Sequence, residues 1–133
     1  MKPIIASLLL LMVASVAVCA DEAPFIVPQD KDGVQRVEVL GGDYFFKPNH
    51  IVVKVNQPVE LVVRKDGWFV PHSFVIDAPE AGIKVKESLS QDPKSIAFTP
   101  TKVGSYPFYC DKKPPFLASH REKGMEGVLE VVE

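Results

Sequence analysis

The feature that most constrains the fold is a two-residue period of apolar side chains, many of them β-branched. Such a period puts the apolar side chains on one face of an extended chain, so each segment that carries it predicts a half-buried β-strand. Turn-forming residues such as Asn56-Gln57-Pro58 separate these segments. The alternating residues are Val37 and Val39; Ile51, Val53 and Val55; Val59, Leu61 and Val63; Phe74 and Ile76; Ile96 and Phe98; Tyr106 and Phe108; and Leu129 and Val131.

Short strands in this number predict an all-β fold, and we expect an antiparallel Greek-key β-sandwich over residues 34–133. Residues 21–33, with two prolines and a glycine, predict an extended N-terminal segment. Only residues 79–89 could hold a helix, and at most a short one. The 12 prolines fit loops and edge strands better than helices. Functional residues of such a fold are expected on the loops at one end.

Residues 1–20 have the pattern of a signal peptide. Lys2 gives a positive start, residues 4–18 are almost wholly apolar, and Val18-Cys19-Ala20 offers a cleavage site after Ala20. An uncleaved anchor and a lipid anchor on Cys19 remain alternatives, but each of them also exports the domain. We therefore expect a periplasmic or secreted protein with no membrane span once the leader is removed.

The charge balance argues against nucleic acid as a partner. The formal net charge is −2 for the whole chain, and removal of Lys2 makes it about −3. A domain that binds a phosphate backbone is usually strongly basic. We expect a monomer that meets its partners through a local surface.

Cysteine usage gives the first indication of chemistry. The chain has two cysteines, and loss of Cys19 with the leader leaves Cys110 alone. A single thiol in an oxidising compartment is buried and inert, paired with another chain, or bound to a metal. Metal binding is therefore one of three alternatives before any motif is considered.

Strand parity brings Cys110 and a histidine to the same end of the sandwich. His72 precedes Phe74 by two residues, and Cys110 follows Phe108 by two. Residues at even spacing share a face of a strand, so both side chains are expected to point inward at the rim of the core.

The residues after Cys110 add two further donors, in the pattern Cys-x9-His-x4-Met formed by Cys110, His120 and Met125. One thiolate, two imidazoles and a weak thioether are acceptable to both Cu(I) and Cu(II). With His72, the set predicts a site for one copper ion that needs little rearrangement between the two oxidation states. The third histidine, His50, lacks this context and is predicted to be a surface or structural residue.

Several motifs resemble those of the cupredoxins, the plastocyanin and azurin family of blue copper proteins. The similarity covers about residues 34–133 and rests on Phe46-Lys47-Pro48, Ile51-Val52-Val53-Lys54-Val55, Pro71-His72-Ser73-Phe74, Gly104-Ser105-Tyr106-Pro107-Phe108-Tyr109-Cys110 and His120 through Met125-Glu126-Gly127-Val128-Leu129. The resemblance implies a type 1 copper held equatorially by His72, Cys110 and His120, with Met125 as the axial ligand.

The chain departs from that family pattern in its loop and around its ligands. The loop from Cys110 to His120 is longer than in plastocyanin or azurin and closer to that of copper nitrite reductase domains. Ser73 replaces an asparagine that usually ties the strand of the first histidine to the loop after the cysteine. Asp111 replaces a small hydroxyl residue or glycine, and Glu126 is an alternative axial ligand.

Four protein ligands and no open position favour an electron carrier over an enzyme. We expect redox protein partners to dock transiently near the His120 loop, where residues 114–117 are apolar and several cations flank them. The alternative function is a periplasmic copper carrier or buffer that delivers copper to another protein. A thiol hydrolase is disfavoured because no nucleophile elbow surrounds Cys110.

Overall fold

The computed structural model describes residues 22–133 and contains two packed β-sheets. The predicted signal peptide, including its cleavage site, lies outside the described residues. The elements are β1 (Phe25–Ile26), β2 (Gln35–Gly42), β3 (Phe45–Lys47), β4 (His50–Lys54), β5 (Val59–Lys65), β6 (Ser73–Ala78), the 3-10 helix η1 (Pro79–Ala81), β7 (Ile83–Ser88), β8 (Lys94–Phe98), β9 (Gly104–Tyr109) and β10 (Glu126–Val132).

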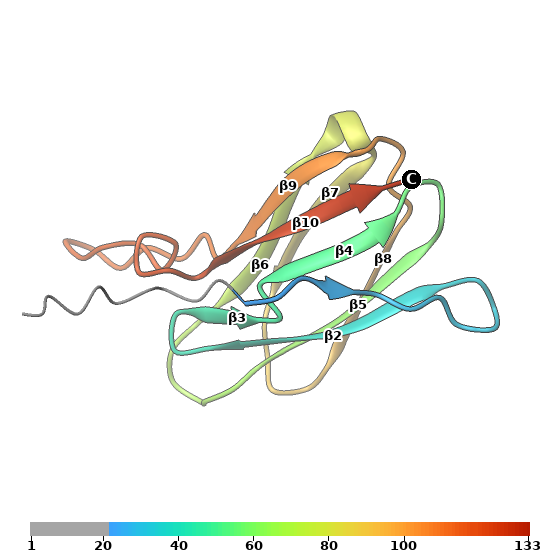
Figure 1. Cartoon of the computed structure of the whole chain (residues 1–133). Helices are drawn as coiled ribbons and strands as arrows, with labels where there is room; N and C mark the ends of the chain where they lie inside the picture. The colour runs from blue at the N-terminus through green and yellow to red at the C-terminus, as the bar shows by residue number, and fades with distance from the viewer. Residues whose placement is uncertain (1–21) are drawn as a thin grey trace, which may run out of the picture.

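The six-stranded sheet has the order β1-β4-β10-β9-β6-β7, and the four-stranded sheet has the order β3-β2-β5-β8 (Figure 1). The predicted β-sandwich is confirmed, and η1 is the short helix expected within residues 79–89. Strand pairing is mixed, however, and not wholly antiparallel. The pairs β1/β4, β4/β10 and β2/β5 are parallel, because the chain crosses between the sheets and later strands return beside earlier ones in the same direction.

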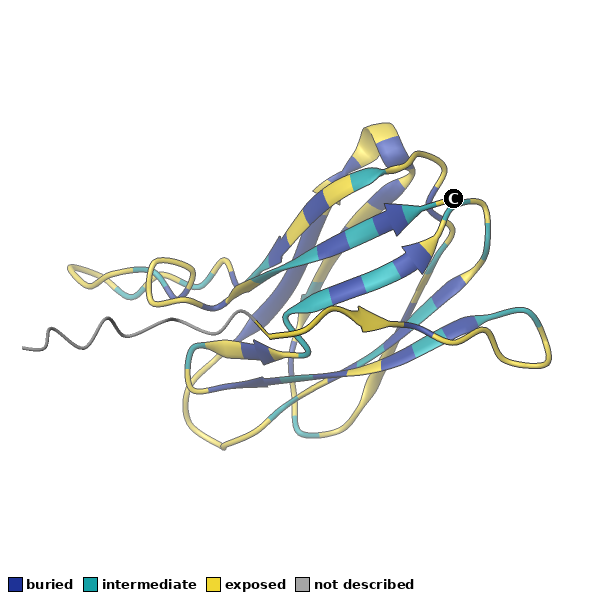
Figure 2. Ribbon diagram, viewed as in Figure 1, coloured by how far each residue is buried: buried dark blue, intermediate teal, exposed yellow. Residues whose placement is uncertain are grey.

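The core lies between the two sheets, where buried and exposed residues alternate along most strands (Figure 2). The predicted apolar positions fill it: Val39, Val53, Leu61, Phe74 and Phe108 are each at most 1% exposed. The aromatic rings of Phe46, Phe74 and Phe108 pack together, with centroids 5.1–5.5 Å apart. These rings lie beneath the strand ends that carry the candidate ligands, so a rigid core supports that end of the sandwich.

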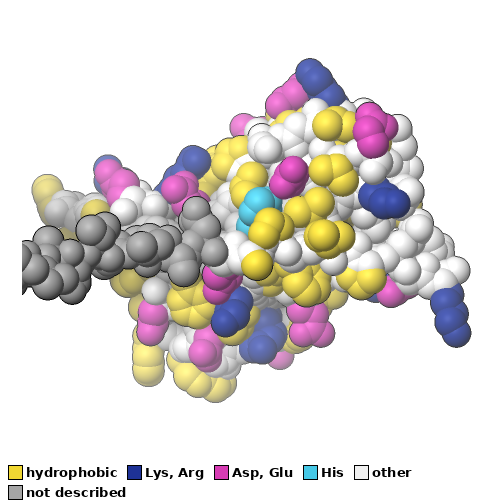
Figure 3. All heavy atoms as spheres, in the orientation of Figure 1, with side chains coloured by type: hydrophobic (Ala, Val, Ile, Leu, Met, Phe, Trp, Pro, Cys, Tyr) yellow, Lys and Arg dark blue, Asp and Glu magenta, His cyan; other side chains and the backbone are white. Residues whose placement is uncertain are grey.

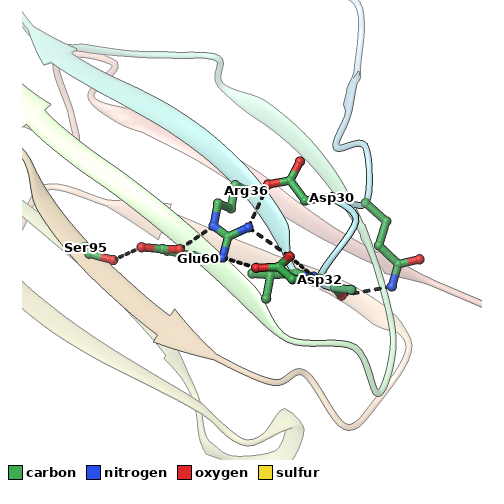
Figure 4. Close-up of polar contacts among 8 residues, drawn as sticks. Asp30, Asp32, Arg36, Glu60 and Ser95 are labelled. Atoms are coloured by element: carbon green, nitrogen blue, oxygen red, sulfur yellow. Dashed lines mark hydrogen bonds and ion pairs between the residues drawn. The ribbon is translucent and has the colours of Figure 1, made fainter.

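Residues 22–33 pack against the sandwich through β1, which pairs with β4, and through buried Val27. The turn that follows β1 is tied down by Arg36. Its guanidinium binds Asp30, Asp32 and Glu60, and Glu60 accepts a hydrogen bond from Ser95 on β8 (Figure 4). Arg36 holds the pKa of the Asp32 carboxyl at about 2.

Hydrophobic side chains also gather on the outer face of the six-stranded sheet (Figure 3). His50 lies on this sheet, half-buried, and its Nε2 is 2.8 Å from Glu130 on β10. Among residues 22–133, the side chains that could share a metal ion are those of His72, Cys110 and His120, without His50, and the contact with Glu130 agrees with the surface or structural role predicted for His50. No helix among residues 22–133 is long and apolar enough to cross a membrane.

Candidate metal centre

Three of the four predicted ligands meet at one end of the sandwich. His72 directly precedes β6, Cys110 directly follows β9, and His120 lies in the loop between β9 and β10. The Nδ1 atoms of the two histidines are 3.1 Å apart, and the Cys110 Sγ lies 3.5 Å from Nδ1 of His120 and 4.0 Å from Nδ1 of His72. All three side chains are buried, and their ligand atoms lie within 4.8 Å of one another, which suits a single metal ion.

Strand pairing explains how residues 38 positions apart come together. Strands β6 and β9 are antiparallel, with Val75 opposite Tyr109, so the start of β6 lies beside the end of β9. The Ser73 N–H donates to the Cys110 sulfur over 3.3 Å. The predicted inward orientation of Cys110, in line with Phe108, is confirmed by the complete burial of both side chains.

The fourth predicted ligand, Met125, is held beside the other three by main-chain hydrogen bonds. Its N–H donates to the carbonyl of His120 over 3.0 Å, and its carbonyl accepts from the N–H of Cys110 over 3.1 Å. The side chain is fully buried and extends toward Gly41 on β2, where a Cβ would lie 3.2 Å from the methionine methyl group. Glu126, the alternative axial ligand, is half exposed and binds Arg121 over 2.7 Å.

Electrostatics keep both histidines neutral, which is the form that binds a metal. Burial lowers the pKa of His72 to about 4, and the charges of His120 and Lys65 contribute in the same direction. Burial also lowers the pKa of His120, with further contributions from Lys123 and Lys112. Neither imidazole must therefore lose a proton before it binds an ion at neutral pH.

The two departures near the cysteine, Ser73 and Asp111, contact each other. The Ser73 hydroxyl lies 2.6 Å from Asp111 Oδ1 and accepts a hydrogen bond from the Asp111 N–H over 2.9 Å. The other carboxylate oxygen of Asp111 binds Lys86 on β7 over 2.9 Å. Hydrogen bonds from Ser73 and Lys86 lower the pKa of Asp111. These contacts fasten the loop after the cysteine to β6 and β7.

Sequence reasoning missed Tyr44, which lies in the turn between β2 and β3 with a positive φ of 61°. Its ring meets the His120 ring edge-on at a centroid distance of 5.0 Å, and Nζ of Lys123 lies over the Tyr44 ring, 4.3 Å from its centroid. Nothing in the local pattern of residues around Tyr44 distinguishes it from an ordinary turn residue, since the contact depends on how the turn meets a distant loop.

A hollow of about 410 Å³ opens beside His120. It is lined by Tyr44, Phe69, Val70, Pro71, Lys112, Lys113, Pro114 and His120. Apolar side chains around it reach into solvent; Phe69 is 97% exposed, and Trp68, Phe116 and Leu117 are also well exposed. Among residues 22–133, the ion pairs do not include Lys112, Lys113 or Lys123. The lining of the hollow is therefore mainly apolar, with two lysines among its side chains.

Comparison with solved structures finds the same fold in several other proteins. The metal-binding domain of the Cu(I)-exporting P-type ATPase of Streptococcus pneumoniae D39, solved with Cu(I), is 20% identical with a TM-score of 0.61, over 84% of this chain and 99% of that chain. Auracyanin of Roseiflexus castenholzii is 19% identical with a TM-score of 0.58, over 74% and 97%. The periplasmic domain of cytochrome oxidase subunit II of Bradyrhizobium japonicum is 18% identical with a TM-score of 0.54, over 74% and 83%.

A comparison with curated proteins finds no match. The family model of the cupredoxin-like domain, however, matches residues 4–125, which is most of the chain. The match agrees with the two-sheet architecture and with the resemblance seen in the sequence motifs. The protein therefore belongs to the cupredoxin-like domain family.

Proposed function

We propose that this chain is an exported type 1 copper protein that carries single electrons between redox partners. His72, Cys110, His120 and Met125 would hold one copper ion. The observation that carries the proposal is the convergence of three buried ligand atoms within 4.8 Å, on a thiol and two neutral imidazoles. A copper ion held by these residues would supply one-electron redox chemistry, the Cu(II)/Cu(I) couple, for transfer between a donor and an acceptor.

The remaining residues suit a carrier better than an enzyme. Each ligand is anchored by a strand end or by main-chain hydrogen bonds, so the site can keep its shape in both oxidation states. His120 lies beside the surface hollow, and we propose that electrons enter and leave through its ring. The exposed side chains of Phe69 and Phe116 would give a redox partner a small apolar docking surface. Lys112 and Lys113, which line the hollow beside His120, would steer an acidic partner toward it.

Export follows from the proposed signal peptide, with cleavage after Ala20 and a domain over residues 34–133. An exported chain with one thiol needs that thiol protected, and a buried metal site protects it.

The test is a visible spectrum of the protein lacking its first twenty residues, recorded after Cu(II) addition and again after ascorbate. An intense thiolate-to-copper band that bleaches and returns on reoxidation is expected. Cys110→Ser would abolish the band, while the matched control His50→Gln, on the outer face of the sheet, would retain it. Wild-type protein that folds but shows no such band would refute the ligand assignment.

Delivery of copper to another protein is the second candidate, since the similar domain from the Streptococcus pneumoniae exporter was solved with Cu(I). Copper carriers favour exposed, labile thioether sites, whereas Met125 is the single methionine of residues 22–133 and is fully buried. Rapid loss of copper from the wild-type protein to a chelator would favour delivery. Retention over many oxidation cycles would favour electron transfer.

A further inference from the structure

The Cys110 sulfur has two possible hydrogen-bond donors on Ser73. The main-chain N–H lies 3.3 Å from the sulfur, and the side-chain hydroxyl oxygen lies 3.6 Å from it. A serine hydroxyl has one proton and can donate it to one acceptor at full strength. The sulfur and the Asp111 carboxylate compete for that proton, because Asp111 Oδ1 lies 2.6 Å from the same hydroxyl.

Geometry favours the carboxylate in this competition. An O–H···O contact of 2.6 Å is typical of a hydrogen bond to an ionised acceptor, whereas sulfur is a weak acceptor and the contact to it is long. The Asp111 N–H donates back to the serine oxygen over 2.9 Å, so two atoms of Asp111 fix the hydroxyl. Lys86 binds the second carboxylate oxygen over 2.9 Å and holds the group in place.

We propose that Asp111 is a positioning residue that withholds the Ser73 hydroxyl proton from the Cys110 sulfur. The sulfur then keeps the main-chain N–H as its donor from Ser73. This inference deepens the proposed function and rests on the copper site proposed above. Hydrogen bonds to the sulfur ligand of a copper site tune the reduction potential of that site. A hydrogen bond favours the reduced state, in which the sulfur carries more negative charge, so Asp111 would lower the potential.

The first test removes the competing acceptor. In copper-loaded Asp111→Ala, the Ser73 hydroxyl is free to turn toward the sulfur. The ratio of Cu(I) to Cu(II) binding constants is expected to rise about tenfold, the size of effect given by one hydrogen bond to a charged group. The thiolate-to-copper band is expected to shift to higher energy. Asp111→Asn removes the charge but keeps an oxygen acceptor, so it should give a smaller change in both readouts.

A double variant separates the hydroxyl from the charge. In Asp111→Ala combined with Ser73→Ala, no hydroxyl is left to donate, and most of the shift is expected to disappear. The matched control is Asp77→Ala, which removes an exposed carboxylate from β6 of the same sheet and should leave the band in place. The proposal is overturned if the double variant keeps the full shift of Asp111→Ala, or if Asp111→Asn alone reproduces it.

A measurement without copper keeps this inference separate from the function it rests on. Ser73 is 2% exposed, so its hydroxyl proton should exchange slowly and give a downfield NMR signal in the wild-type apoprotein. The signal should stay downfield in Asp111→Asn and move upfield in Asp111→Ala, where the weaker sulfur acceptor replaces the carboxylate. Absence of the signal from folded wild-type apoprotein would overturn the hydrogen bond. Absence of a thiolate-to-copper band from wild-type protein would instead overturn the copper site.

Discussion

The copper-free protein is expected to lose stability as the pH falls from 7 to 5, because His72 is buried without its proton. Its side chain is 3% exposed, and its pKa falls from the usual 6.5 to about 4. Between these values the unfolded chain binds a proton that the folded chain does not, so the free energy of unfolding falls with pH. From these two pKa values, His72 alone removes about 2 kcal/mol between pH 7 and pH 5.

The assay is urea denaturation of chelator-treated protein, followed by circular dichroism at pH 7, 6 and 5. His120, whose pKa is also lowered, adds to the loss in the same direction. Glu60 and Asp111 have lowered pKa values, so their ionised forms stabilise the folded protein. That stabilisation is lost mostly below pH 4.5 for Glu60 and pH 3.8 for Asp111, their usual pKa values, and so outside most of the range of the assay. His72→Gln should therefore flatten the dependence by about 2 kcal/mol. Equal stability of the wild type at pH 7 and pH 5, or an undiminished loss in His72→Gln, would refute this reasoning.

Three further outcomes follow from packing and charge. Gly41→Ala would place a Cβ 3.0 Å from Leu89 and 3.2 Å from the Met125 methyl group. We expect the free energy of unfolding in urea to fall by about 1–3 kcal/mol and the copper band to shift. Unchanged values would mean that these side chains move aside freely. Phe108→Ala should cost about 3–5 kcal/mol by the same assay, since its fully buried ring packs on two other phenylalanines; a loss below 1 kcal/mol would contradict that packing. Replacing Lys112 and Lys113 with glutamine should slow reduction by an acidic partner and weaken its salt dependence in stopped-flow measurements; a rate that is insensitive to salt in the wild type would exclude steering.

The sequence predicts burial well and strand direction poorly, for one physical reason. A two-residue period reports which face of a strand is buried, and Val39, Leu61 and Phe108 are buried as their pattern requires. This alternation is the same whether the neighbouring strand runs parallel or antiparallel. It therefore gives no information on which strand lies alongside or in which direction that strand runs. The parallel pairs β2/β5 and β4/β10 result from crossovers between the sheets, and a crossover depends on the whole chain rather than on one segment.

The candidate site divides in the same way. His72 and Cys110 could be brought together from strand parity because regular strands position both of them. The Tyr44 contact with His120 could not, since it joins a turn to a loop and neither has a period.

Ser73 and Asp111 show how two local differences can form one structural feature. In the sequence each is a separate departure from the family pattern, in which an asparagine beside the histidine ties its strand to the loop after the cysteine. In the structure the two kinds of side chain are exchanged. The hydroxyl is on Ser73, beside the histidine, and it donates over 2.6 Å to the carboxylate of Asp111, which follows the cysteine. Replacement of Asp111 leaves the Ser73 hydroxyl, at a position only 2% exposed, with the weaker sulfur acceptor alone. Replacement of Ser73 removes hydrogen bonds from Asp111, which lies at the surface and keeps its contact with Lys86. The two positions are therefore coupled, and a substitution at one must be interpreted together with the residue at the other.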